Sequence, residues 1–292
     1  MLNWDFGKLS TVKYETNTHI INNNFDNISL SADTADITFI PSGDGNCKIV
    51  CYEESKIKHS VTVEDGTLNI QKRDERKWYE HIGINFHSHK ITVYLPAGEY
   101  GRLTIRTDTS DTKIAKDFKF KNIDINQSTG DVINYASALE CIQIKTSTGR
   151  ITTEGISAKT IDLSTSTGAI VASEIACEGN ITTNVSTGKT SLTNITCKNL
   201  SSDGNTGDGV LKNVIAAEKF SIKRSTGDIQ LEGCDAAEIS ITTDTGDVRG
   251  TLLSEKVFIA QTDTGHVDVP KTSSGGRCEI TTDTGDIKIA ID

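Results

Sequence analysis

The stretch ISITTDTGDV, residues 239–248, decides the fold. Apolar Ile239 and Ile241 alternate with polar residues before Gly246, and Val248 resumes the alternation after it. Alternation with a period of two residues is typical of a β-strand with one buried face. Glycine adopts a positive φ without steric cost, so a glycine between two such runs predicts a sharp corner. The stretch therefore predicts a strand, a corner and a second strand.

The same unit recurs through most of the chain. The dipeptide Thr-Gly occurs nine times at spacings of 19 or 20 residues, and Ser, Asn or Asp precedes it each time. A degenerate tenth copy at residues 108–111 carries Ser110 in place of glycine. The nine structural corner glycines are Gly130, Gly149, Gly168, Gly188, Gly207, Gly227, Gly246, Gly265 and Gly285. Such regular spacing indicates a repeat architecture with a column of stacked threonines beside the corner.

The length of the repeat selects the fold class. A unit of 19–20 residues with two short strands cannot bury its own apolar side chains. Units stacked about 4.8 Å apart let each inward residue lie on its copies in the neighbouring units. We therefore predict an all-β, single-stranded parallel β-solenoid, or β-helix. A leucine-rich repeat is excluded because its leucine pattern and helical period are missing, and a propeller blade needs about twice the length.

The two ends of the chain differ from its middle. Residues 1–100 lack the repeat but contain many strand-like runs, including a predicted hairpin from Val63 to Leu68. We predict that they form an N-terminal cap continuous with a solenoid of residues 101–292. No C-terminal cap is visible after Gly285, so we expect the last coil to present an open edge. The charges of Lys288 and Asp292 would guard that edge, or a partner or a second copy of the chain would cover it.

Composition and charge limit the partners. The chain carries 30 Lys+Arg against 40 Asp+Glu, a net charge of −10, and no run of basic residues. This argues against nucleic acid or an anionic lipid surface as the main partner. No stretch approaches the roughly 20 apolar residues that cross a bilayer, and no signal or anchor is visible. Of the seven cysteines, Cys47 and Cys51 lie on one strand face about 13 Å apart, too far to bridge, and we expect buried free thiols.

Stacked carboxylates are one candidate for chemistry. Asp-Thr-Gly, the aspartic protease tripeptide, occurs three times, but stacked corners hold its copies side by side rather than face to face, which excludes a protease dyad. The column after the corner glycine also carries aspartates, interrupted in sequence by His266. We expect a solvated acidic corner, with a weak Ca²⁺ site as the alternative. The candidate ligands are Asp244, Asp247, Asp263, Asp283 and Asp286.

A second candidate lies between residues 77 and 90. This segment holds the aromatic and histidine cluster of the chain: Trp78, Tyr79, His81, His87 and His89. We predict a surface loop or hairpin that serves as a contact patch, because aromatics rimmed by polar residues often anchor partners. His87 and His89 could also place two imidazoles on one strand face, as a zinc site requires, but no third ligand is identified.

The sequence resembles a known bacterial family. Residues 91–105, with ITVYLP leading through Glu99-Tyr100 into Leu103-Thr104-Ile105, followed by Ser-Thr-Gly-Asp-Ile and Asp-Thr-Gly-Asp-Val units, are similar to the putative-adhesin or toastrack domain. The resemblance implies a relative of right-handed β-helices, an extracytoplasmic location, and roles in adhesion or in sensing envelope stress. It implies no catalytic residue. We also expect no cofactor, apart from the alternative of weakly bound Ca²⁺. Residues 4–9 resemble the segment that follows a membrane anchor in Gram-positive members.

These sequence features and the family resemblance leave two main functional hypotheses. The preferred one is a non-enzymatic, extracytoplasmic domain, membrane-anchored in the full-length protein of a Gram-positive bacterium, that presents a rigid surface to an unknown ligand. The alternative is a regulatory domain that senses envelope stress through a protein partner. A carbohydrate-active enzyme is a weaker third hypothesis, since such sites need a groove lined by carboxylates and aromatics, and only 5% of the residues are aromatic.

Overall fold

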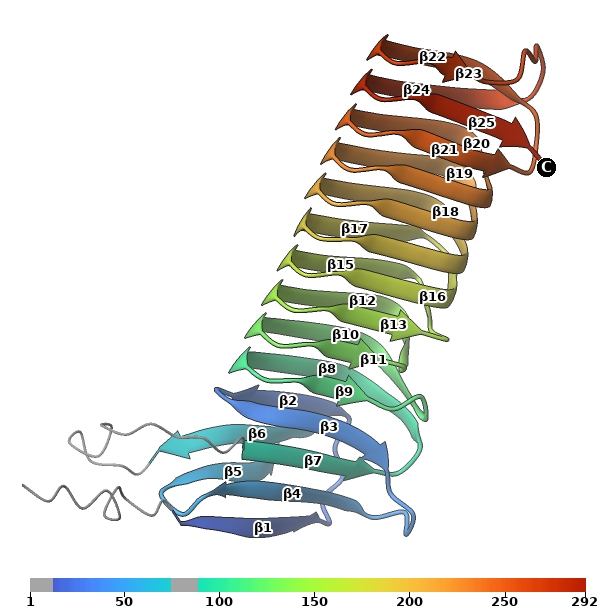
Figure 1. Cartoon of the computed structure of the whole chain (residues 1–292). Helices are drawn as coiled ribbons and strands as arrows, with labels where there is room; N and C mark the ends of the chain where they lie inside the picture. Colours follow the sequence, from blue (N-terminus) through green and yellow to red (C-terminus); the bar gives the residue numbers. More distant parts are fainter. Residues whose placement is uncertain (1–12, 75–88) are drawn as a thin grey trace, which may run out of the picture.

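The computed structural model describes residues 13–74 and 89–292. In this part all regular secondary structure is β, and the strands belong to one hydrogen-bonded network with no helix that could cross a membrane. Successive turns of the chain lie one above the other in a tall stack (Figure 1). The predicted all-β parallel solenoid is confirmed.

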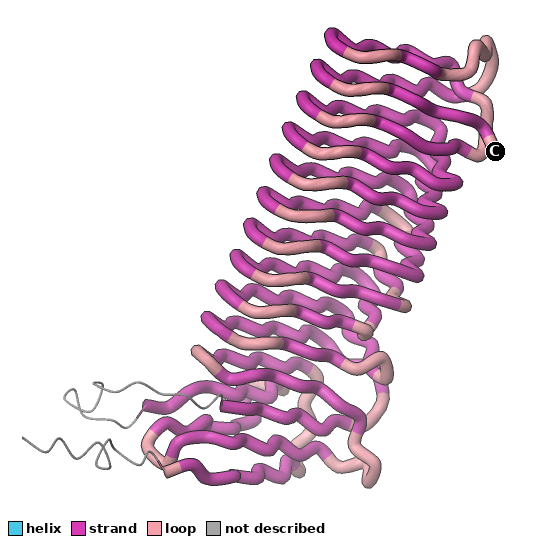
Figure 2. The backbone as a smooth tube through the Cα atoms, viewed as in Figure 1, coloured by secondary structure: helices cyan, strands magenta, loops and turns pink. Residues whose placement is uncertain are grey.

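Each coil consists of a leading strand, the Thr-Gly corner and a trailing strand. The leading strands are β8 (Gly98–Thr109), β10 (Phe118–Thr129), β12 (Ser137–Thr148), β15 (Thr160–Thr167) and β17 (Asn180–Thr187). The trailing strands are β9 (Thr112–Ile114), β11 (Val132–Asn134), β13 (Ile151–Glu154) and β16 (Ile170–Cys177), with β14 (Ser157–Ala158) on the return path. Further along, the trailing strand of one coil runs into the leading strand of the next within β18 (Thr190–Thr206), β19 (Gly209–Thr226) and β20 (Ile229–Thr245). Corners appear as short loops in Figure 2.

The core is a set of apolar columns between the leading and trailing sheets. Ile123, Ile142 and Ile161 align in parallel register in the leading sheet, and each is at most 1% exposed. Ile151 and Ile170 align in the same way in the trailing sheet and are fully buried. A low apolar fraction therefore suffices for a continuous core, because each inward residue is covered by its neighbours in the stack.

The corner needs glycine for two reasons. Gly168 has a φ of +147°, outside the range that residues with a side chain favour. A Cβ added there would also lie 2.0 Å from the carbonyl oxygen of Gly149 in the preceding coil. That carbonyl accepts a hydrogen bond from the inward Thr165 hydroxyl at 3.0 Å, and the Gly149 N–H donates to the Thr167 carbonyl at 2.9 Å. The positive φ follows from the sequence, whereas the close backbone approach is a finding of the structure.

Stacked coils begin within the region predicted as a cap. Strands β2 (Asn27–Ala32) and β3 (Ala35–Pro41) pair in parallel with β8 and β9, with Ala35 in the position of the corner glycine. On their other side lies a coil from further along the sequence, made of β6 (Thr67–Asp74) and β7 (His89–Leu95). This end of the stack therefore does not follow chain order.

Antiparallel strands close the amino-terminal end. Strand β4 (Cys47–Glu54) pairs with β7 and with the outer strand β1 (Tyr14–Ile21), while β5 (Ile57–Glu64) pairs with β6. Val63 and Leu68 face each other across β5 and β6, which confirms the predicted hairpin. The turn from β4 to β5 crosses from the trailing to the leading side of the stack.

The carboxy-terminal coils also depart from chain order, and our expectation of which coil is outermost was wrong. Strand β24 (Gly276–Thr284) pairs with β20 on one side and with β22 (Lys256–Thr264) on the other, while β25 (Ile287–Ile291) pairs with β21 (Val248–Leu252). The coil that contains Gly285 is thus inserted beneath the coil of β22 and β23 (Val267–Asp268), which forms the end of the stack (Figure 1).

Side-chain chemistry explains this order. The inserted coil buries Ile280, Ile287 and Ile289, each at most 4% exposed. The outermost coil has the smaller Ala260 at an inward position and Pro270 soon after its short trailing strand. Because proline has no N–H to donate, it is tolerated at an edge and would interrupt an internal ladder. The coil that carries the proline and the smaller partner of Ile280 therefore occupies the position that faces water on one side.

All seven cysteines are free, and most are buried as expected. Cys141 is half-buried and the other six are buried. Burial raises the pKa of Cys197 and of Cys278 to about 12, which keeps these thiols protonated and inert.

Candidate functional site

The acidic corner is held together by its own backbone. The N–H of Asp247 donates to Asp228 Oδ1 at 2.9 Å, and the N–H of Asp286 donates to Asp247 Oδ1 at 2.7 Å. The N–H of His266 donates in turn to Asp286 Oδ1 at 3.0 Å. Because the last two coils are exchanged, His266 ends this column instead of interrupting it. Each carboxylate therefore satisfies a backbone donor of the next coil, a structural role independent of any cation.

A cation of the protein itself lies beside these carboxylates. The Arg249 guanidinium is 2.6 Å from Asp247 Oδ2 and 3.6 Å from Asp286 Oδ2. The other predicted ligands, Asp244, Asp263 and Asp283, are exposed at equivalent positions one step before the Thr-Gly pair. The structure thus brings all five predicted aspartates to one corner of three adjacent coils. A weak Ca²⁺ site there stays a prediction.

Substitution of Asp247 tests the hydrogen-bonding role of this column of aspartates. Replacing it with alanine removes the acceptor for the Asp286 N–H, and we expect a loss of about 1 kcal/mol in the free energy of unfolding. Asp247→Asn keeps an oxygen acceptor and is expected to cost less than about half of that. Urea unfolding followed by circular dichroism measures both. Equal costs for the two variants would contradict the hydrogen-bonding role, and a rise in Tm with millimolar Ca²⁺ that Asp247→Asn abolishes would establish the cation site.

A threonine ridge runs along the same corner over ten coils. Consecutive members are paired in register from strand to strand, and all ten are exposed. The ridge consists of Thr109, Thr129, Thr148, Thr167, Thr187, Thr206, Thr226, Thr245, Thr284 and Thr264, in spatial order. Neighbouring strands lie about 4.8 Å apart, so the ridge presents hydroxyl groups at that repeat. The predicted threonine column is present.

The structure describes only one of the five residues of the predicted contact patch. Trp78, Tyr79, His81 and His87 lie outside the described residues. His89 is described, and it is buried at 7% exposure instead of lying on the surface we expected.

His89 lies among buried polar groups. Its Nδ1 is 3.3 Å from the Thr34 hydroxyl, and its Nε2 is 3.7 Å from Glu54 Oε1 with no hydrogen-bond partner among the described residues. Burial lowers the pKa of His89, and the nearby Glu54 carboxylate only partly opposes this. The Tyr14 ring lies 5.8 Å away, centroid to centroid.

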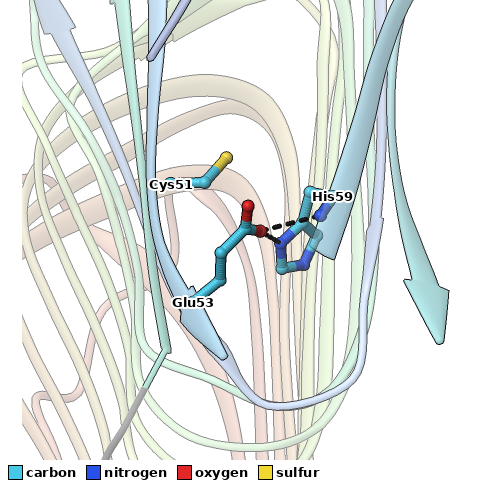
Figure 3. Close-up of side chains that lie close together, drawn as sticks. All are labelled: Cys51, Glu53 and His59. Carbon is cyan, nitrogen blue, oxygen red and sulfur yellow. Dashed lines mark hydrogen bonds and ion pairs between the residues drawn. The ribbon is translucent and has the colours of Figure 1, made fainter. Parts of the chain in front are cut away.

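Next to it is a cluster that sequence reasoning missed. Cys51 and Glu53 point inward from β4, and His59 points inward from β5, so that their side chains meet (Figure 3). One donor atom of each lies within 4.8 Å of the other two, and all three residues are buried. Residues two apart on a strand share a face, so a carboxylate two residues after Cys51 on a buried strand was a readable signal.

Hydrogen bonds fix Glu53. Its Oε2 accepts from the His59 backbone N–H and lies 2.7 Å from His59 Nδ1, while Oε1 accepts from Asn17 Nδ2 at 2.8 Å. Burial opposes ionisation, but the hydrogen bonds from His59 and Asn17 outweigh it and hold the pKa of Glu53 below its usual range. Burial and the Glu53 carboxylate together raise the pKa of Cys51 to about 12.

A groove near the carboxy-terminal end bears on the enzyme hypothesis. Its volume is about 520 Å³, and small side chains line most of it, among them Ala216, Ala236 and Gly276. Three charged residues line it, and two of them, Lys256 and Asp235, form an ion pair at 2.5 Å, while the third is Glu255. No aromatic side chain lines this groove, so it lacks the stacking platform that a carbohydrate-active site needs.

Most of the chain matches one protein family. The model described as Toastrack DUF4097 matches residues 25–185 and 173–292. No curated protein matches the sequence. Among solved structures, the chain is similar to a "putative adhesin" of Bacteroides fragilis, with 16% sequence identity, a TM-score of 0.48 and coverage of 97% of this chain and 99% of that one. It is also similar to a "putative adhesin" of Parabacteroides merdae, with 11% identity, a TM-score of 0.47 and coverage of 96% of this chain and 97% of that one. A "putative lipid binding protein" of Parabacteroides distasonis has 13% identity and a TM-score of 0.43, with coverage of 94% of this chain and 97% of that one.

Proposed function

This chain belongs to the toastrack DUF4097 family, and from that premise we propose that it is a non-enzymatic, extracytoplasmic binding domain of adhesin type. The observation that carries the proposal is the threonine ridge, a line of exposed threonines repeated over ten coils. Such a ridge suits an extended ligand of the cell envelope or of a surface that contacts several coils at once. The similarity of residues 4–9 to the segment after a Gram-positive membrane anchor supports an anchored full-length protein in such a bacterium.

Protease treatment of intact cells tests the location. Cells that express the native, untrimmed gene are shaved with protease, and the domain is then detected by blotting. We expect loss of the domain from intact cells. Protection until the cells are lysed would overturn the adhesin proposal.

Substitutions on the ridge test the surface. We expect Thr167→Lys with Thr187→Lys to reduce binding of the purified domain to isolated envelopes by tenfold or more, because two lysines disrupt a continuous line of hydroxyl groups. The matched control carries Asn126→Lys and Asn184→Lys on the exposed face of the leading sheet, with the same added charge. Equal binding by the two double variants would exclude the ridge as the contact surface.

A second candidate function, envelope sensing through a partner, is favoured by the open edge of β22. Val257 and Ile259 on this strand are 39% and 48% exposed. Strand β22 pairs on one side with β24, and among the described residues nothing pairs with its other side. A protein partner that adds a strand there, or a second copy of the chain, would cover both the backbone groups and the apolar side chains. Ile259→Lys would then abolish the association measured by light scattering.

A further inference from the structure

The closed amino-terminal end of the solenoid holds an unusual group of side chains. Cys51, Glu53, Glu54, His59 and His89 are all buried, with exposures between 0% and 7%. Elsewhere in the described core, the inward columns are mostly apolar residues and threonines. Removing carboxylates and imidazoles from water is costly unless they are paired or bind a metal. This concentration of ligand-type side chains at one place therefore calls for a specific role.

The geometry of three of them fits a single small cation. The Cys51, Glu53 and His59 donor atoms lie within 4.8 Å of one another, with Glu53 and His59 in direct contact at 2.7 Å. A tetrahedral zinc site, with bonds of about 2.0–2.3 Å, places its donors roughly 3.3–3.7 Å apart. The Glu53–His59 separation is shorter than that range and the distances from Cys51 are at most 4.8 Å, so the three donors need only small shifts to surround one ion.

The donor set also selects the class of ion. A thiolate, an imidazole and a carboxylate together suit zinc and related transition metals, whereas Ca²⁺ and Mg²⁺ prefer oxygen ligands alone. We propose that Cys51, Glu53 and His59 bind one divalent cation of the zinc class, with His89 as the fourth ligand.

An independent observation points to the same place. His89 Nε2 is buried and has no hydrogen-bond partner among the described residues. The antiparallel register of β4 and β7 pairs Tyr52 with Lys90, so the next pair in that register is Glu53 with His89. His89 therefore lies beside the three-residue cluster, with its Nε2 3.7 Å from Glu54 Oε1 and without a hydrogen bond among the described residues. A rotation of the His89 ring from Glu54 toward the cluster would supply the fourth ligand of a closed site.

Surrounding groups already orient the ligands. Asn17 on β1 donates to Glu53 Oε1 at 2.8 Å, and the His59 backbone N–H donates to Glu53 Oε2 at 2.7 Å. Hydrogen bonds of this kind fix the direction of a metal-ligating carboxylate. The bound ion would join β4 of the trailing side to β5 of the leading side. It would thus fasten the end of the stack, where strands have a neighbour on one side only.

Cobalt gives a direct test, because a thiolate ligand produces a charge-transfer absorption with Co²⁺. The full chain is unfolded in urea with chelator and reductant, refolded with Co²⁺ alone, and desalted. We expect about one equivalent of retained cobalt and the charge-transfer band. The matched control is Cys47→Ala, on the same strand and the same buried face as Cys51. It is expected to keep both signals, and Cys51→Ala and Cys51→Ser are expected to lose them.

Two further measurements complete the test. A His81→Ala, His87→Ala variant is expected to retain the cobalt band, which excludes metal capture by those two histidines. After refolding with Zn²⁺, chelation is expected to lower the Tm of the wild type by roughly 5–10 °C and to leave that of Cys51→Ser unchanged. Absence of a cobalt band in the wild type overturns the proposal whatever the variants do, as does an unchanged band in Cys51→Ser.

Discussion

Replacing Gly168 with alanine is expected to lower the free energy of unfolding by about 3–5 kcal/mol. Two costs add at this corner. The positive φ of +147° is unfavourable for any residue with a Cβ, and the new Cβ would meet the Gly149 carbonyl oxygen at 2.0 Å. Because Gly149 is itself a corner residue of the preceding coil, the strain cannot be relieved without moving a second corner. Urea unfolding monitored by circular dichroism measures the loss.

Two other glycines separate these costs. Gly155 also has a positive φ, +65°, but an added Cβ there meets no atom within 4 Å. We expect Gly155→Ala to cost about 1–2 kcal/mol, the conformational part alone. Gly98 has neither a positive φ nor a close neighbour, and Gly98→Ala should leave stability nearly unchanged. A loss in Gly168→Ala no larger than that in Gly155→Ala would show that the close approach of the coils carries no cost.

The second large effect is expected from an arginine inside the solenoid. Arg224 is 1% exposed and occupies a column in which neighbouring coils carry small residues or threonine. It donates to the Ser202 carbonyl at 2.8 Å and to the Ser202 hydroxyl at 3.0 Å. Gly204, its partner in the preceding coil, leaves space for the side chain, because a Cβ at Gly204 would lie 3.1 Å from Arg224 Nε, as well as 2.9 Å from the Val185 carbonyl oxygen.

This fit predicts a strong coupling between the two positions. Gly204→Val in the wild type is expected to cost about 3 kcal/mol through overpacking against Arg224. In an Arg224→Thr background the clash with the arginine is removed but the approach to the Val185 carbonyl oxygen remains, so the cost should fall to about 1 kcal/mol. A double-mutant cycle from urea unfolding is expected to give a coupling of about 2 kcal/mol. Additive effects would show that Gly204 is not there to accommodate the arginine.

The regular middle of the fold could be predicted because one short unit specifies both its strands and its neighbours. Alternation around Gly246 sets the two strands, and the constant spacing sets the stack. The exchange of the last two coils could not be read from the spacing, since Gly265 and Gly285 have the same surrounding pattern. Pro270 and the small Ala260 were the relevant signals, but they indicate the outermost coil only when one asks which coil tolerates a position at the edge of the stack.

Whether a candidate site could be predicted also depends on whether it lies within the repeat. The acidic corner and the threonine ridge could be located because each repeat places one member at the same position. The buried cluster lies where the repeat is absent, and His59 reaches Cys51 and Glu53 only because β4 and β5 belong to different sides of the stack. Such a meeting depends on tertiary pairing rather than on local pattern. His89 was identified for its chemistry, but its burial reverses the surface role expected for it.

The exchanged coils at the carboxy-terminal end have a consequence for synthesis on the ribosome. Coils up to β20 and β21 can each dock onto the preceding one as the chain emerges. Strand β22 has no such template, because its neighbour β24 is made later. Residues 256–269 must therefore wait until the segment 276–291 has been released and inserted. A nascent chain stalled near residue 275 would carry one completed solenoid and one apolar segment without a docking site, a window in which chaperones or proteases can act.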